Sequence, residues 1–146
     1  MGDLNAVSFA QIAHANLLRK FGGLREEHSL VYRRPIPMSA VQEGVMIDDH
    51  VVTAIVPLTS RPEDAMQELE AAKAGGEASG DVDVIARSLR AYESIGIQPK
   101  VEKQVRFSFG PVDVWGGTYD GIVGSCRSKL AVHWRAFGVT SLGAEN

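Results

Sequence analysis

The stretch EGVMIDDHVV, residues 43–52, places two adjacent aspartates between short runs of apolar and β-branched residues. Runs of this kind, separated by residues that tolerate a tight turn, predict a β-hairpin with Asp48 and Asp49 at its tip. One interpretation of the pair is a turn alone, because aspartate suits turn geometry. The other is a binding site for a divalent cation, since Mg²⁺ prefers oxygen ligands and two carboxylates at a rigid tip converge on one point.

Length and composition narrow the class of protein. The 146 residues suffice for one domain with a hydrophobic core, and 45% hydrophobic residues is a globular composition. A net charge of −3 gives no overall basic field for nucleic acid, although a local patch would still allow it. The single Cys126 allows no internal disulfide, and no apolar run approaches the roughly 20 residues of a membrane span. We expect an intracellular protein, cytoplasmic or nuclear, with no membrane partner.

Hydrophobic periodicity predicts the remaining elements. The predicted helices span residues 4–21, 61–74 and 81–95, with a short one over 127–137; the predicted strands span 45–47, 51–56, 105–109 and 112–119. Ser60 and Asp81 are the expected caps of the second and third helices. The two prolines in residues 24–42 indicate an irregular or extended connection. We expect an α+β fold, a small antiparallel sheet with helices packed on one face.

Four short motifs follow one another along the chain. They are MGDLNA with FAQ at residues 1–11, MIDD at 46–49, AYESIGIQPKVEK at 91–103, and VWG with DGI between residues 114 and 122. In this order they resemble the second to fifth conserved blocks of the reverse transcriptase (RNA-directed DNA polymerase) palm, most closely the retroelement, or retrotransposon, type. The resemblance implies a palm-like domain over 1–126, followed over 127–146 by the start of a thumb or connection, or by a C-terminal helix.

The resemblance also implies templated nucleotidyl transfer by a two-metal mechanism. The cofactor would be Mg²⁺ or Mn²⁺, and the partners a nucleic acid template-primer and deoxynucleoside triphosphates. Asp48 would be a metal ligand, and Asp49 a weaker ligand or a structural acceptor beside it. Lys103, or Lys100, would lie near the triphosphate to stabilise charge or donate a proton.

Five further residues would contact substrate or nucleic acid if the resemblance holds. Gly2 would leave room for the incoming nucleotide and template, Asn5 would orient the helix start, and Gln11 would face the templating side. Trp115 and Gly116 would form the loop that seats the terminal phosphates of the primer.

The chain departs from the family pattern in ways that bear on activity. The family's first block, with a further metal-binding Asp on a strand, has no counterpart here, because the chain begins inside the second block. The helix over 61–74 lengthens the link after the hairpin, and Gln98 stands where the family has Asn. We therefore expect an N-terminally truncated palm, or one completed by an upstream segment, that is inactive alone. One bridging ligand is worth several kcal/mol in phosphoryl transfer.

Ordinary explanations compete with these roles. Gly2 and Asn5 are common helix-start residues, the two lysines suit a solvated surface, and Trp115 suits the core side of a strand. The four histidines lack the spacing of a zinc site, and His50 is expected on the face of its strand opposite to Asp49. The rival hypothesis is a non-catalytic remnant or nucleic-acid-binding module that keeps the palm fold.

Overall fold

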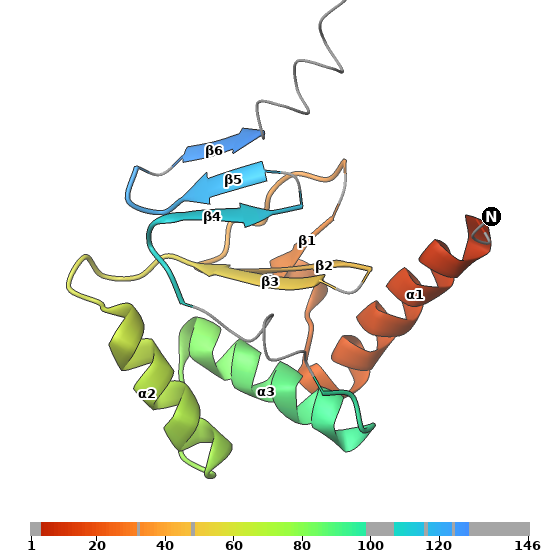
Figure 1. The fold of residues 1–146 in the computed structure, drawn as a ribbon, viewed down its shortest axis with the longest axis horizontal. Coiled ribbons are helices and arrows are strands. Elements are labelled where there is room, and N and C mark those ends of the chain that lie inside the picture. Colours follow the sequence, from red (N-terminus) through yellow and green to blue (C-terminus); the bar gives the residue numbers. More distant parts are fainter. Residues whose placement is uncertain are drawn as a thin grey trace, which may run out of the picture. The chain divides into compact units, whose positions relative to one another are not determined.

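The computed structural model describes residues 4–31, 33–47, 49–98, 107–115, 117–123 and 125–128. The chain divides into two compact units, Met1–Phe107 and Ser108–Asn146. Each unit contains one three-stranded sheet, and the helices within the described ranges belong to the first unit (Figure 1). The expected α+β class is therefore confirmed. No helix in the described ranges combines the length and the apolar character needed to cross a membrane.

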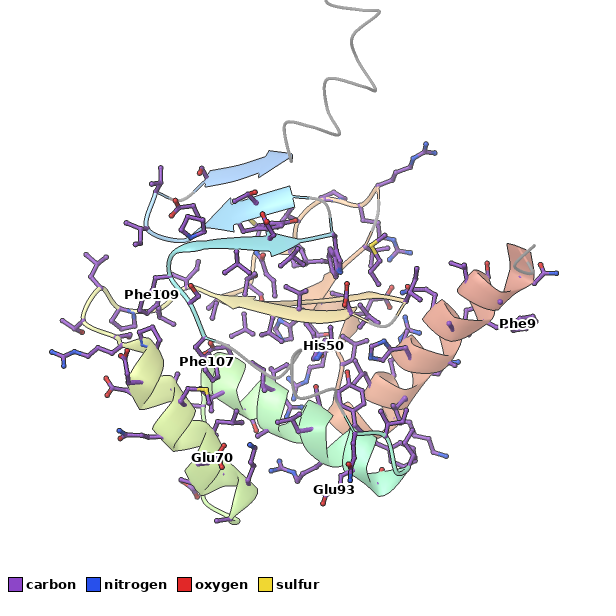
Figure 2. The ribbon with its side chains drawn as sticks, in the orientation of Figure 1. Phe9, His50, Glu70, Glu93, Phe107 and Phe109 are labelled. Carbon is purple, nitrogen blue, oxygen red and sulfur yellow. The ribbon has the colours of Figure 1, made fainter. Side chains whose placement is uncertain are left out.

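The first helix, α1, spans Leu4–Leu17 and continues into a π-helical turn, η1, over Leu18–Gly22. It ends where Gly23 adopts a left-handed φ of 73°, which glycine reaches without a steric cost. The prediction of a helix over 4–21 is thus confirmed. Leu18 is fully buried at the end of the helix, whereas Phe9 is 69% exposed and points away from the rest of the unit (Figure 2).

The sheet of the first unit has the strand order β1-β2-β3. A short 3₁₀ helix, η2 (Glu26–His28), leads into β1 (Ser29–Leu30), which pairs in parallel with β2 (Val41–Met46). Strand β2 pairs antiparallel with β3 (Asp49–Ala54). The predicted hairpin is confirmed and is longer than expected. The prediction of a purely antiparallel sheet is wrong, because the connection over 24–42 supplies a parallel strand.

Two amphipathic helices follow the hairpin: α2 (Pro62–Lys73) and α3 (Gly80–Ser94). Their apolar faces pack on each other. The buried core is Leu69, Ala72, Val82 and Ala86, with Ala65, Ala78, Ile85, Leu89 and Phe107 packed against it. Burial of these faces, rather than helix propensity, accounts for most of the stability of such short helices.

The expected caps of α2 and α3 are both wrong. The N-caps are Arg61 and Ser79, and neither makes a capping hydrogen bond through its side chain. At α2, Pro62 occupies the first turn, where its missing N–H needs no partner. At α3, the amide and hydroxyl of Ser79 instead donate to the Glu68 carboxylate of α2, at 2.7 and 3.2 Å. The serine therefore connects two helices.

The second unit contains an antiparallel sheet of β4 (Pro111–Val114), β5 (Gly117–Asp120) and β6 (Ser125–Ser128). The prediction of one strand over 112–119 is wrong, because the chain turns at Trp115, which has a φ of 51°. Of the strand predicted over 105–109, residues 107–109 are not in a strand, and residues 105 and 106 lie outside the described ranges. The last two residues of β6, Arg127 and Ser128, belong to a strand where the helix over 127–137 was expected to begin. The rest of that expected helix lies outside the described residues.

Candidate functional site

The hairpin tip, residues 46–49, joins β2 to β3 next to α1. Met46 pairs with Asp49 in the last register position of the hairpin. Ile47 has a φ of 55°, in the left-handed region that β-branched residues rarely adopt. A conformation of this kind costs about 1–2 kcal/mol and persists only where its surroundings hold it. The contacts around Ile47 therefore decide the geometry of the tip.

Two side chains of α1 hold the tip through its backbone. The Gln11 carboxamide donates through Nε2 to the Val45 carbonyl at 2.8 Å, and its Oε1 accepts from the Ile47 amide. The Nδ1 of His14 lies 2.8 Å from the Ile47 carbonyl oxygen. Because a carbonyl only accepts, Nδ1 of His14 must carry the proton. Both backbone polar groups of Ile47 are thus satisfied by one helix.

Behind the tip lies a polar cluster of four residues: His14, Glu43, His50 and Tyr92. The Tyr92 hydroxyl is 2.7 Å from Nε2 of His14, and it donates that bond when the imidazole is neutral, since the proton is then on Nδ1. The Nε2 of His50 donates to the Glu43 carboxylate at 2.9 Å. Ring centroids of the two histidines and the tyrosine lie 5.6 to 6.5 Å apart. The cluster joins α1, the hairpin and α3 (Figure 2).

Burial makes this cluster electrostatically sensitive. Glu43 is only 3% exposed, and a carboxylate so buried needs a partner, which His50 supplies. Burial raises the pKa of Tyr92 well above its ordinary value, and the Coulombic effect of Glu43 raises it further. Both effects keep the proton on the Tyr92 hydroxyl, where it can be donated to His14.

Sequence reasoning missed most of this cluster. Hydrophobic periodicity places Tyr92 on the apolar face of its helix, and no motif gives Glu43 a role. The sequence offered little evidence that Glu43 is buried. Successive residues of a strand point to opposite faces, so Glu43 had an even chance of facing the core. His50 does face inward while Asp49 is exposed, as expected from strand alternation.

The structure places only some of the residues to which the resemblance assigns roles. Asp48, Gly2, Lys100, Lys103 and Gly116 lie outside the described residues. Gln11 is at the hairpin tip, and Asn5 is exposed in the first turn of α1. Trp115 is in the β4–β5 turn of the second unit, and its indole N–H has no hydrogen-bond partner within the described ranges. Their contacts with nucleic acid stay predictions.

The tip carries aspartate carboxylates, which are the type of ligand that Mg²⁺ prefers. Asp49 is exposed at the first position of β3, and Asp48 precedes it in the sequence. Protein sites for Mg²⁺ commonly use one or two carboxylates, completed by water and substrate phosphates. Within the part of the chain that the structure describes, no three His, Cys, Asp or Glu side chains are grouped to hold a metal ion together. Any site at the tip would therefore rest on the aspartate pair and on ligands from elsewhere.

No family model, curated protein or solved structure matches this chain.

Proposed function

We propose that this chain is part of the palm of an RNA-directed DNA polymerase, and that Asp48 and Asp49 hold Mg²⁺ or Mn²⁺ there for templated nucleotidyl transfer. The observation that carries the proposal is the clamp of Gln11 on the Val45 carbonyl and the Ile47 amide. The helix and hairpin that carry the second and third motifs are directly bonded to each other, two residues before Asp49.

The clamp supports a role in positioning carboxylates. Catalysis of phosphoryl transfer depends mainly on charges held in place before the reaction begins. When the backbone of a hairpin tip is held in place, the Cα positions of its side chains are fixed as well. The backbone of an unsupported turn can move, and its side chains move with it. When bound, the metal would supply Lewis-acid activation of the attacking hydroxyl and charge neutralisation on the nucleotide phosphates.

The proposal includes the expectation that these 146 residues alone do not extend a primer. Two-metal sites of this kind use a further carboxylate, which the matched motifs do not supply. Primer extension on a homopolymer template, with Mg²⁺ or Mn²⁺, tests this part. Nucleotide incorporation that depends on Asp48 would contradict the inactivity but would support polymerase chemistry.

Metal binding is tested separately by the melting temperature in Mn²⁺. A cation that binds only the folded state stabilises it by about 2.7 kcal/mol at a hundred times its dissociation constant. We expect Mn²⁺ to raise the melting temperature of the wild type but not that of Asp48→Asn/Asp49→Asn. The matched control is Glu63→Gln/Asp64→Asn, which removes a different pair of adjacent acidic residues, both exposed in the first turn of α2.

The control separates local binding from general screening. If the tip variant and the control variant keep the same Mn²⁺ effect as the wild type, the aspartates serve only the turn. A non-catalytic module would then describe the chain better. If only the tip variant loses the effect, the metal role of the pair stands even where primer extension fails.

A further inference from the structure

The fourth sequence motif, residues 91–103, meets the candidate site through Tyr92. Tyr92 lies in the last turn of α3, and its hydroxyl is 2.7 Å from Nε2 of His14. Nδ1 of the same ring is 2.8 Å from the Ile47 carbonyl oxygen. A continuous chain of hydrogen bonds therefore runs from α3 through α1 to the residue just before the acidic pair.

These two bonds fix both the proton and the orientation of the His14 ring. A carbonyl oxygen only accepts, so Nδ1 donates to Ile47, and Nε2 of the neutral ring accepts from Tyr92. Rotating the ring by half a turn would place carbon atoms opposite both partners. Because that rotation would break two bonds rather than one, the Tyr92 hydroxyl holds Nδ1 at the Ile47 carbonyl.

A hydroxyl suits this position because it can either donate or accept. It donates to neutral His14; when His14 is protonated, both ring nitrogens donate and the hydroxyl accepts. Burial and the nearby Glu43 carboxylate raise the pKa of Tyr92 well above its ordinary value, so the hydroxyl keeps its own proton while His14 changes charge. The Glu43 carboxylate itself accepts from Nε2 of His50 at 2.9 Å. The bond to Ile47 is therefore available in both charge states of His14.

The Tyr92 hydroxyl is not needed to join the two helices. Leu18, just beyond α1, is fully buried, and Gly22 lies so close to α3 that a Cβ there would be 3.5 Å from the Ser88 Cα. Tyr92→Phe keeps the aromatic ring and removes only the hydroxyl. We expect the helix packing to survive this substitution, while the carbonyl of Ile47 loses its fixed partner.

We propose that Tyr92 is a positioning residue for the metal ion at the hairpin tip, acting through His14 on the backbone of Ile47. This role rests on the proposed function, because the ion is the one assigned to Asp48 and Asp49. Ile47 has a φ of 55°, a conformation that persists only where its surroundings hold it. Tyr92 helps to hold it, so that the two carboxylates extend from a fixed backbone.

The test is a titration of the whole chain with Mg²⁺, followed by NMR at the backbone amides of Ile47 and Asp49. Tyr92→Phe should weaken Mg²⁺ binding about three- to tenfold, the usual range for the loss of one neutral hydrogen bond. Ile85→Ala is the matched control on the same helix, because it removes packing from the α2–α3 core rather than a bond to His14. It should leave the Mg²⁺ affinity unchanged.

A spectroscopic readout separates positioning from a general loss of stability. The side-chain ¹⁵N signals of His14 in mildly alkaline solution report which ring nitrogen carries the proton. We expect the Nδ1-protonated form alone in the wild type and in Ile85→Ala, and a mixture with the Nε2-protonated form in Tyr92→Phe. In a double-mutant cycle, Tyr92→Phe should have no further effect on Mg²⁺ affinity once His14→Leu has removed the imidazole.

The outcomes distinguish the role of Tyr92 from the function on which it rests. If the wild type binds no Mg²⁺ at the tip, the metal role of the aspartates and the role of Tyr92 both fail. If the wild type binds the ion there and Tyr92→Phe binds it equally tightly, only the role of Tyr92 is overturned. It is also overturned if Ile85→Ala weakens binding as much as Tyr92→Phe, or if the two effects in the cycle are additive.

Discussion

Replacing Gln11 by leucine should loosen the hairpin tip by a predictable amount. The substitution keeps the size of the side chain and its helix propensity but removes the carboxamide. It thereby removes two part-buried hydrogen bonds, to the Val45 carbonyl and from the Ile47 amide. At about 0.5–1.5 kcal/mol for each bond, the free energy of unfolding should fall by about 1–3 kcal/mol. Urea unfolding followed by circular dichroism measures this change.

A matched control distinguishes the clamp from a general effect on α1. Asn16→Leu, on the same helix, removes only a 3.3 Å exposed bond from Arg19. Its effect should stay within about 0.5 kcal/mol. Hydrogen exchange gives a local readout, because the Ile47 amide should lose protection in Gln11→Leu and keep it in Asn16→Leu. If the two variants have the same stability and the same exchange at Ile47, the clamp does not hold the tip.

Other consequences follow from the polar cluster and from Gly23. His50→Leu leaves the buried Glu43 carboxylate unpaired and should cost about 3 kcal/mol or more, whereas adding Glu43→Leu should restore part of that loss in urea unfolding. Tyr92 should ionise at a pH well above the ordinary pKa of a tyrosine, as seen by subtracting the ultraviolet titration of Tyr92→Phe from that of the wild type. Since its folded-state pKa is raised, its contribution to stability is fully present below about pH 10 and is lost as the pH rises beyond that, so alkaline unfolding should begin earlier in the wild type than in the variant. Gly23→Ala combines a φ of 73° with a Cβ 2.0 Å from Arg87 and should cost at least about 1 kcal/mol in thermal unfolding.

Features with a local signal were predictable from the sequence. The hairpin is encoded by apolar runs around a turn, and helices α1, α2 and α3 by their periodicity and glycine ends. Details that depend on distant residues were not. Ser79, for example, would cap a helix by local rules, yet its hydroxyl bonds to Glu68, eleven residues earlier. Likewise the turn at Trp115 carries a positive φ that nothing in its residue type favours.

The candidate site was predictable only in part, for the same reason. The acidic pair could be found because it is a contiguous motif. The polar cluster could not, because its members come from α1, β2, β3 and α3, and Tyr92 meets His14 across 78 residues of sequence. Only the packing of these elements reveals that a tyrosine on an amphipathic helix donates to a histidine that supports the hairpin tip. Sequence motifs alone therefore could not predict the contact between Tyr92 and His14.

Paramagnetic broadening by Mn²⁺ tests the central claim most directly. If Asp48 and Asp49 hold the ion, substoichiometric Mn²⁺ should first broaden the backbone amide signals of Met46, Ile47 and Asp49 in the wild type. The same signals should stay sharp in Asp48→Asn/Asp49→Asn. Broadening that begins elsewhere on the chain, or that is equal at the tip in both proteins, would contradict the assignment of the hairpin as a metal-binding element.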